Sequence, residues 1–390
     1  MVAVAGSSLT PFGRRKDHSS FRDWAAEAFF GALTMADLDQ SDIDTLIVAS
    51  ESDFFTLQLN PASIIADDLG LTGTIAFRVE GGGASGQLAV HAAVARLKSG
   101  LSRHVAVIGV DASASTLPAN LVKDLYSFSF DAWTDGMNGA SATMLYALSF
   151  QDFMARAGVG VEDLEIVTIK NRRNACDNPG AHLPRRHDAT EIAASPMIAA
   201  PYRRLHCSPL SDGAAAVILS RVDALPGSRR TAPRITGIGA ASDRTNLGAR
   251  PKPGDFAAKR LAMQRACAMA GIGPTQIDAA EIYDAYAGSE LQSIAALGLS
   301  EDLRGELHDG AFEKSGRLPV NLSGGLMGQG APAGATGVGQ MATCAMLLEG
   351  RYHPGLQPAR PLTHALADTH GGICTTSALT ILSQPEAAWT

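Results

Sequence analysis

Two glycine-rich segments contain residues suited to stabilising a negatively charged oxygen. Gly81-Gly82-Gly83 precede an apolar stretch that predicts a helix from about Ser85 to Lys98. Backbone N–H groups at the start of a helix can be aimed at an oxyanion, so we expect Gly83 to take part in such a site. A second segment, 321–325, reads Asn-Leu-Ser-Gly-Gly, where Asn321 and Ser323 add polar side chains. Glycines that serve only close strand–helix packing are the alternative interpretation.

Candidates for proton transfer follow an apolar strand predicted over 280–283. Tyr283 ends this strand and Asp284 comes next. A phenol has a pKa of about 10, and it can donate a hydrogen bond or, with a lowered pKa, act as a base. Tyr286 and His370 are candidates for a second proton-transfer group, and Gly372 is a further candidate for holding an oxyanion. Each aromatic side chain could instead fill the core.

A basic segment predicts a site for phosphate groups. Residues 170–206 contain seven Lys or Arg against three acidic residues, a local charge of +4 in a chain of −7. Arginine binds phosphate through two parallel hydrogen bonds. The candidates for this role are Arg172, Arg173, Arg185, Arg203 and Arg204. A solvated basic surface is the alternative.

Composition excludes several other classes of protein. The 390 residues are 46% hydrophobic, which is enough for a large core, and the net charge of −7 argues against nucleic-acid binding. Five cysteines form no CxxC pair, so we expect a reduced cytoplasmic protein without a metal site. We expect neither a signal peptide nor a transmembrane helix.

An internal repeat predicts that the chain is built from two similar halves. Residues 35–44 resemble residues 269–278 at a constant offset of 234, and both segments link an Ala-rich helix to an apolar strand. A strand, glycine loop and helix follow in each half, the second helix being predicted from about Ala335 to Leu348. We therefore predict α/β halves over 1–230 and 231–390, with an inserted region at about 115–206 in the first.

Together these segments resemble the thiolase superfamily. The likeness extends over nearly the whole chain and includes the loop 79–86, the segment 208–216, Glu281–Tyr286, the loop 321–337 and Gly371–Cys374. The sterol-carrier-protein-type thiolases and the thiolase-like aldolases of steroid side-chain degradation are the most similar branch. The resemblance implies a duplicated five-layer αβαβα fold, a homodimer, and coenzyme A thioesters as substrates.

Three departures from the family pattern bear on the chemistry. Gly83 stands where the pattern has a nucleophilic cysteine, and Gly330-Ala331-Pro332 stand where it has Gly-His-Pro. Tyr283-Asp284 replace a His-Asp pair, as in the aldolases that the chain resembles. Some of those aldolases have another tyrosine in the loop that contains Ala331, so the second proton-transfer group is open.

The resemblance and its departures predict a retro-aldol cleavage of a β-hydroxyacyl-CoA, with no cysteine nucleophile and no bound cofactor. Gly83, Asn321, Ser323 and Gly372 would stabilise the thioester enolate, and Tyr283 with Tyr286 or His370 would move protons. One alternative is acyl transfer by a displaced nucleophile such as Cys374, and another is a non-catalytic subunit that binds CoA thioesters. The resemblance also implies an accessory partner with a zinc ribbon and an OB-fold barrel, which would hold the zinc itself.

Overall fold

Nine strands form one large mixed sheet in a computed structural model that describes residues 1–15 and 17–385. The strand order is β3-β2-β4-β7-β1-β8-β11-β10-β9. Their bounds are β1 Val2–Leu9, β2 Thr45–Ala49, β3 Ile75–Val79, β4 His104–Ala112, β7 Asp212–Arg221, β8 Arg234–Ser242, β9 Ala279–Glu281, β10 His364–Gly371 and β11 Thr376–Ser383.

The second half of this sheet repeats the topology of the first. In the first half β2 pairs in parallel with β3 and β4, and β7 is antiparallel to both β4 and β1. In the second half β9 pairs in parallel with β10, and β11 is antiparallel to β10 and β8. A single parallel bridge between Ala280 and Val320 stands in the place of the β2–β3 pair. The predicted duplicated fold is confirmed.

The repeated sequence segments form the same local structure. Helix α1 (Phe21–Ala36) ends at Asp37 in the left-handed conformation, and α9 (Ala257–Ala270) ends in the same way at Gly271. A short 3-10 turn follows each, at Gln40–Asp42 and at Pro274–Gln276, before the next strand. The offset of 234 therefore repeats a complete helix end and strand entry.

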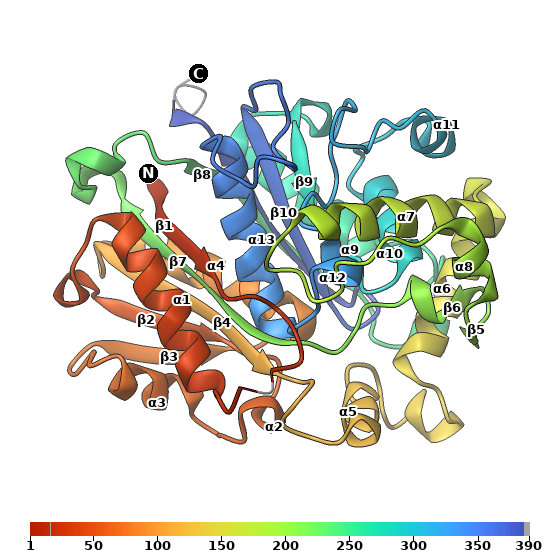
Figure 1. Cartoon of the computed structure of the whole chain (residues 1–390), viewed down its shortest axis with the longest axis horizontal. Helices are drawn as coiled ribbons and strands as arrows, with labels where there is room; N and C mark the ends of the chain where they lie inside the picture. The colour runs from red at the N-terminus through yellow and green to blue at the C-terminus, as the bar shows by residue number, and fades with distance from the viewer. Residues whose placement is uncertain (16, 386–390) are drawn as a thin grey trace.

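Helices cover both faces of the sheet and fill the space between its halves (Figure 1). Helices α1 and α3 (Pro61–Asp68) pack on the outer face of the first half, and α9 packs on β8 and β11. Between the halves, α4 (Ser85–Lys98) and α13 (Ala333–Leu348) contact strands of both. Alternation along β1 explains why each face is apolar, because Val2 and Val4 face α4 and α13 whereas Ala3 and Ala5 face α1.

The inserted region forms a cap of helices over the second half of the sheet. It contains α5 Ala119–Tyr126, α6 Ala142–Ala157, α7 Val161–Asp177, α8 Ala189–Ala194 and the hairpin of β5 Met197–Ala199 with β6 Tyr202–Arg203. Helices α6 and α7 pack on α10 (Ala287–Ala296), and α7 also packs on α12 (Gly325–Gly328). The two remaining helices are α2 Asp53–Thr56 and α11 Leu303–His308.

The two predicted central helices agree closely with the structure, but the strand predicted over 280–283 ends at Glu281, so Tyr283 lies beyond it. Helix α4 has the predicted bounds, and α13 begins two residues before the predicted Ala335. The boundary proposed near residue 230 stays a prediction. Among the residues that the structure describes, no helix is both long and apolar enough to cross a membrane.

Candidate active site

Two glycine loops from the two halves of the molecule meet at the centre. Gly81–Gly83 lie between β3 and α4, and Gly371 ends β10, with Gly372 directly after it. A Cβ built on Gly82 would lie only 3.3 Å from the Cα of Gly371, and a Cβ on Gly371 would overlap the carbonyl oxygen of Gly81. Gly82 also has a φ of +60°. This close approach therefore requires glycine in both loops.

The Tyr283 side chain lies against Gly83. A Cβ built on Gly83 would overlap the Tyr283 hydroxyl, and it would lie 2.6 Å from Cζ of that ring and 2.5 Å from the His370 carbonyl oxygen. Real Cβ atoms do not approach this closely, so Tyr283 fits only because residue 83 is glycine. The missing side chain at residue 83 and the large phenol at residue 283 therefore depend on each other, because the phenol occupies the space that a side chain at 83 would need.

A cavity of about 710 Å³ opens beside these two residues. Of the residues predicted from the sequence, those lining it are Gly83, Arg172, Arg185, Arg204, Tyr283, Tyr286, His370 and Gly372. The predicted Arg173, Arg203, Asp284, Asn321 and Ser323 are not among the lining residues. The structure therefore brings the two predicted proton-transfer tyrosines, the histidine and both glycine loops to one site.

Burial controls the ionisation of Tyr283. Its side chain is 7% exposed, and burial, followed by the nearby Glu51 carboxylate, raises the pKa of the phenol well above 10. The phenol therefore keeps its proton at neutral pH. In this environment Tyr283 is suited to donating a proton or a hydrogen bond, and the prediction that it acts as a base is not supported.

His370 is held in a chain of hydrogen bonds that occupies both ring nitrogens. The Tyr146 hydroxyl donates its one proton to the Gly372 carbonyl oxygen at 2.6 Å, so His370 Nε2 must donate to Tyr146 Oη at 2.9 Å. His370 Nδ1 then accepts from Lys259 Nζ at 3.1 Å. Lys259 in turn pairs with the Asp368 carboxylate.

Because of these contacts, His370 is not suited to act as a base. Burial and the Lys259 ammonium lower its pKa well below 6.5, so the imidazole is neutral. Its one lone pair points at Lys259 and not at the cavity. His370 therefore positions the Tyr146 hydroxyl and the Gly372 carbonyl, and no proton-transfer role is proposed for it.

Tyr286 belongs to an aromatic wall of the cavity. Its ring stacks on Tyr202 with 5.1 Å between centroids and lies 4.6 Å from the ring of Tyr146. The Tyr286 hydroxyl lies 2.8 Å from Thr143 Oγ1. Burial raises its pKa above 10, so this side chain is also a protonated phenol. The wall provides an apolar surface for an acyl group.

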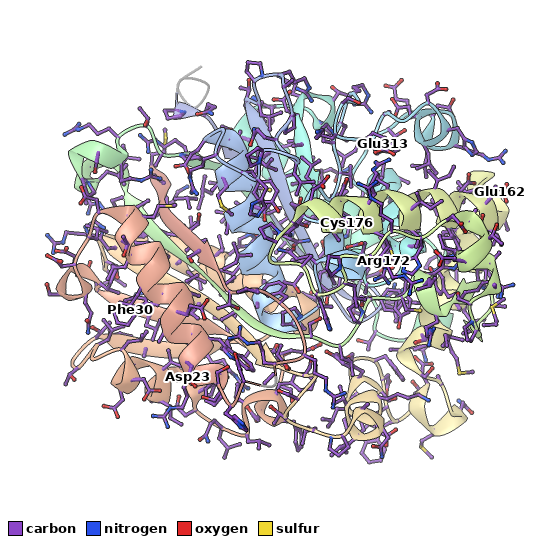
Figure 2. The ribbon with its side chains drawn as sticks, viewed as in Figure 1. Asp23, Phe30, Glu162, Arg172, Cys176 and Glu313 are labelled. Atoms are coloured by element: carbon purple, nitrogen blue, oxygen red, sulfur yellow. The ribbon has the colours of Figure 1, made fainter. Side chains whose placement is uncertain are left out.

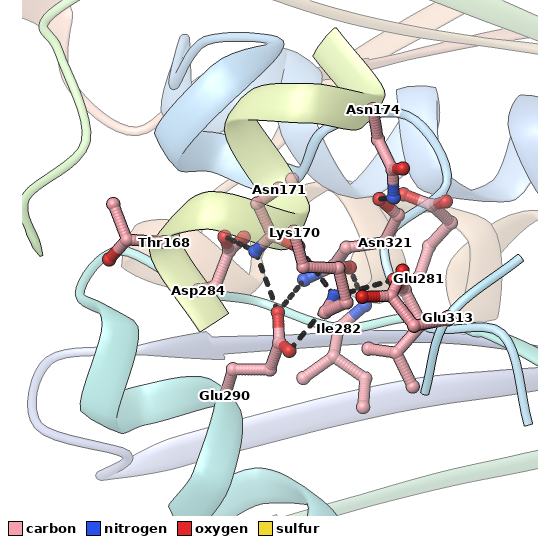
Figure 3. A network of polar contacts seen from close by, with 12 residues as sticks. Thr168, Lys170, Asn171, Asn174, Glu281, Ile282, Asp284, Glu290, Glu313 and Asn321 are labelled. Carbon is pink, nitrogen blue, oxygen red and sulfur yellow. Dashed lines mark hydrogen bonds and ion pairs between the residues drawn. The ribbon is translucent and has the colours of Figure 1, made fainter. Parts of the chain in front are cut away.

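Asp284 and Asn321 are buried in a polar network behind the cavity (Figure 3). Asp284 accepts hydrogen bonds from Leu326 N at 2.7 Å and from Asn171 Nδ2 at 2.8 Å. The Asn321 side chain accepts from Ile282 N and donates to Glu290, both at 2.7 Å. Their polar atoms therefore fix the backbone on either side of Tyr283, which explains why they do not face the cavity.

Ser323 has a similar structural role. Its hydroxyl contacts the Glu281 carboxylate, which also accepts from Ser323 N at 3.0 Å. The side chains of Asn321 and Ser323 are therefore engaged by Glu290 and Glu281 and do not face the cavity, so the expectation that they stabilise an enolate is not supported. Sequence spacing placed them on a loop beside the site but did not reveal that β9 and α10 engage their polar atoms.

The five predicted arginines fall into two groups. Arg172, which lies on α7, is 2% exposed, lines the cavity, and has no hydrogen-bond partner for Nε among the described residues (Figure 2). Burial lowers its pKa to about 10. Arg173 on the same helix pairs with Glu313, and Arg203 donates to the Ser195 carbonyl oxygen at 2.9 Å. Arg173 and Arg203 do not line the cavity, whereas Arg204 and Arg185, which pairs with Glu191 at 2.9 Å, do.

The cysteines do not provide an activated nucleophile. Cys374 is fully buried in the core, and burial raises the pKa of its thiol to about 12. Cys207 lines the cavity, but burial raises its pKa to about 12 as well. Both thiols are thus protonated at neutral pH. Within residues 1–15 and 17–385, no group of three or more His, Cys, Asp or Glu side chains is arranged to hold a metal ion.

Glu51 and Tyr146 are site residues that sequence reasoning missed. Tyr146 lies on α6 in the inserted region, where no motif marks it. Glu51 comes two residues after the end of β2 and lines the cavity. A signal for Glu51 was present, because polar residues directly after parallel strands often form the site of an α/β protein.

Comparison with known proteins identifies the family. The acetyl-CoA acetyltransferase of Methanothermobacter thermautotrophicus is 33% identical over 386 residues, which cover 98% of this chain and 99% of the relative. The chain belongs to the thiolase superfamily. Residues 239–384 also match the family described as thiolase C-terminal domain-like.

Further relatives include sterol carrier protein 2. Human sterol carrier protein 2 is 26% identical over 387 residues, covering 92% of this chain and 68% of the relative. A solved structure described as an Ltp2-ChsH2(DUF35) aldolase superposes with a TM-score of 0.83 at 24% identity, covering 98% of this chain and 97% of that one. That superposition confirms the fold. The thiolase family uses CoA thioesters, so this protein is an enzyme of acyl-CoA chemistry.

Proposed function

We propose that the enzyme cleaves the Cα–Cβ bond of a β-hydroxyacyl-CoA by a retro-aldol reaction. The products are a ketone or aldehyde and a shortened acyl-CoA. The observation that carries this proposal is the position of the Tyr283 hydroxyl, which fills the space beside Gly83 where the family pattern has a nucleophilic cysteine. An acyl-enzyme cannot form at residue 83, which has no side chain, and a protonated phenol hydroxyl lies in the place of the thiol.

The proposed chemistry needs one base, one acid and an oxyanion site. A base takes the β-hydroxyl proton, the Cβ–O bond becomes a carbonyl, and the Cα–Cβ electron pair moves into a thioester enolate. Tyr283, which is protonated at neutral pH, then donates a proton to Cα. Gly83 and Gly372 line the cavity, and we assign their backbone N–H groups to the enolate oxygen.

The arginines of the cavity wall are proposed to bind the coenzyme. Arg172, Arg185 and Arg204 line the cavity, and the buried Nε of Arg172 has no hydrogen-bond partner among the described residues. The aromatic wall containing Tyr286 would contact a bulky apolar acyl group, and a steroid side chain is one such group. The enolate and phosphate ends of the substrate would thus lie in one cavity.

We also propose that the protein works as a homodimer with an accessory partner. The aldolase structure similar to this chain is described together with a second protein, ChsH2(DUF35), and this supports a heteromeric assembly. The zinc ribbon and OB-fold barrel expected of the partner come from the family resemblance. The partner, and not this chain, would hold that zinc.

Acyl transfer is the second candidate function. Its support is the 33% identity with an acetyl-CoA acetyltransferase over almost the whole chain. This reaction needs a nucleophile or free CoA as the attacking thiol. The raised pKa of Cys374, about 12, and its complete burial argue against the displaced cysteine as that nucleophile.

Product analysis with and without free CoA distinguishes these functions. The protein, co-expressed with its partner, is incubated with a tertiary β-hydroxyacyl-CoA, and the products are measured by mass spectrometry. Retro-aldol cleavage gives a ketone and a shortened acyl-CoA without free CoA. Cleavage that requires free CoA would instead establish thiolytic acyl transfer, and binding without turnover would leave a CoA-thioester-binding subunit.

A further inference from the structure

Glu51 occupies a fixed position at the carboxyl end of β2. Ser50 Oγ donates to Asp111 Oδ1 at 2.8 Å, and Glu51 N donates to Asp111 Oδ2 at 3.1 Å. The same Asp111 carboxylate accepts from Gly334 N at the start of α13 at 2.5 Å. The backbone that carries Glu51 is therefore tied both to β4 and to the central helix layer.

The Glu51 carboxylate and the Tyr283 hydroxyl flank the same pair of glycines. Glu51 Oε1 lies 3.8 Å from the position of a Cβ on Gly82, whereas the Tyr283 hydroxyl fills the corresponding position on Gly83. Glu51 Oε2 is buried and has no hydrogen-bond partner among the described residues. Because both side chains line the cavity, one substrate can contact both.

The surroundings of Glu51 favour proton exchange near neutral pH. Burial, and then the Asp111 carboxylate, raise its pKa to about 8. The Tyr126 hydroxyl opposes this shift and Glu80 adds to it. The other ionisable groups lining the cavity are Lys123, Tyr146, Arg172, Arg185, His187, Arg204, Cys207, Tyr283, Tyr286 and His370.

We propose that Glu51 is the general base of the retro-aldol step and that Glu51 and Tyr283 form a closed proton relay. Glu51 takes the β-hydroxyl proton as the Cα–Cβ bond breaks. Tyr283 gives its proton to Cα of the enolate, and the resulting phenolate takes back the proton that Glu51 holds. Both side chains return to their starting states, and the net change is transfer of one proton from the β-oxygen to Cα.

This inference rests on the proposed retro-aldol function and supplies the base that function lacks. His370 offers its lone pair to Lys259, and Tyr286 is a protonated phenol. Glu51 lines the cavity, and its buried Oε2 has no hydrogen-bond partner among the described residues. A carboxylate with a raised pKa is also a stronger base than an ordinary one, which suits the abstraction of an alcohol proton.

The test compares Glu51→Gln with Glu51→Asp and with the control Glu80→Gln. Glu80 is an exposed carboxylate on the same loop that accepts from Gly82 N, and glutamine can accept this hydrogen bond too. Each variant, co-expressed with the partner, is assayed for ketone release from a tertiary β-hydroxyacyl-CoA between about pH 6 and pH 9.5, and substrate binding is measured by calorimetry.

The relay predicts that kcat/KM of the wild type rises with pH and levels off above about pH 8, since kcat/KM reports the ionisation of the free enzyme. Glu51→Gln should lower kcat about 10²-fold or more with little change in substrate binding, and the rise with pH should disappear. Glu51→Asp should keep a carboxylate-dependent rise at reduced rate, and this variant serves if the glutamine protein does not fold. Glu80→Gln should keep the wild-type rate on the plateau, and its rise should lie at the same or a slightly lower pH, because Glu80 adds a small part of the Glu51 pKa shift.

Failure of the relay and failure of the reaction give different results. If the wild type releases ketone and Glu51→Gln does so at a similar rate with the same pH dependence, Glu51 is not the base, whereas the proposed function stands. If Glu51→Asp loses the rise with pH, the relay is also overturned. If the wild type releases no ketone, the proposed function and the relay both fail.

Discussion

The Tyr283 hydroxyl lies where the side chain of residue 83 would project, so these two positions cannot both hold large groups. The family pattern has a nucleophilic cysteine at the first position and the histidine of a His-Asp pair at the second. Here glycine and tyrosine replace them together, and the buried phenol retains its proton. The site therefore has a proton donor in the position where the family pattern has a nucleophile.

A side chain at residue 83 should therefore be costly. We expect Gly83→Ala to reduce the free energy of unfolding by about 1–3 kcal/mol, because the methyl group would overlap the Tyr283 ring. In a Tyr283→Ala background the cost should fall, though not to zero, since the His370 carbonyl oxygen is also 2.5 Å away. Urea unfolding of the four proteins measures this coupling. Equal costs in both backgrounds would contradict the observed contact.

Tyr283→Phe removes the proposed acid and leaves the ring in place. Ketone release should fall about 10²-fold or more, as expected for loss of a proton-transfer group. Tyr286→Phe is the matched control, because its hydroxyl contacts Thr143 and no proton transfer is assigned to it. Steady-state kinetics on both variants provide the measurement. A similar small effect for the two would mean that the Tyr283 hydroxyl takes no part in the chemistry.

Arg172→Gln should weaken substrate binding, whereas Arg173→Gln should not. The two residues are neighbours on α7, but Arg172 lines the cavity and Arg173 pairs with Glu313 outside it. Charged hydrogen bonds to a phosphate imply an increase in KM of roughly 10- to 100-fold for Arg172→Gln. The melting temperature of the Arg172→Gln variant should rise at the same time. The substitution removes a buried guanidinium whose Nε has no hydrogen-bond partner among the described residues. Equal KM values for the two variants would exclude Arg172 from the binding site.

Cys374→Ala separates the two candidate functions. The thiol is buried in the core and its pKa is raised to about 12, so we expect ketone release within about twofold of the wild type. The loss of stability should be modest, about 1 kcal/mol, because a small core group is removed. Thermal melting and steady-state rates test this. Complete loss of turnover in a folded variant would favour the displaced nucleophile.

The ionisation of Glu51 has a consequence for stability that does not depend on activity. Its pKa is raised from 4.5 to about 8 in the folded protein, so the folded state binds the proton more tightly than the unfolded state does. The contribution of Glu51 to the free energy of unfolding is therefore present below about pH 4.5 and is lost as pH rises toward about 8. Glutamine does not titrate. The unfolding free energy of Glu51→Gln relative to the wild type should therefore increase by roughly 1–3 kcal/mol between about pH 5 and about pH 8. A difference that is independent of pH would show that the Glu51 pKa is not raised.

Much of the architecture could be predicted because local signals repeat along the chain. The segment around Asp37 and its counterpart around Gly271 share the same helix end, turn and strand entry, so a ten-residue similarity revealed a duplicated fold. The glycine loop 81–83 before a predicted helix likewise marked one of the two loops that meet at the cavity, whereas the loop that it meets, Gly371–Gly372, joins β10 to β11.

The direction of the buried side chains could not be predicted in the same way. Asn321 and Ser323 lie on the expected loop, but carboxylates from β9 and α10 bind their polar atoms, and these elements are distant in sequence. His370 lies at the cavity as expected, yet Lys259 on α9 donates a hydrogen bond to the one ring nitrogen that could accept a proton. Such contacts depend on packing between layers, which spacing along one chain does not encode.

Intact-protein and product mass spectrometry during turnover tests the central claim of carbon–carbon cleavage without an acyl-enzyme most directly. The protein and its partner are mixed with a tertiary β-hydroxyacyl-CoA in heavy water without free CoA and quenched at intervals. We predict an unmodified protein mass throughout, release of the ketone, and deuterium at Cα of the shortened acyl-CoA. A protein mass increased by the acyl group, with release only when free CoA is added, would contradict the account.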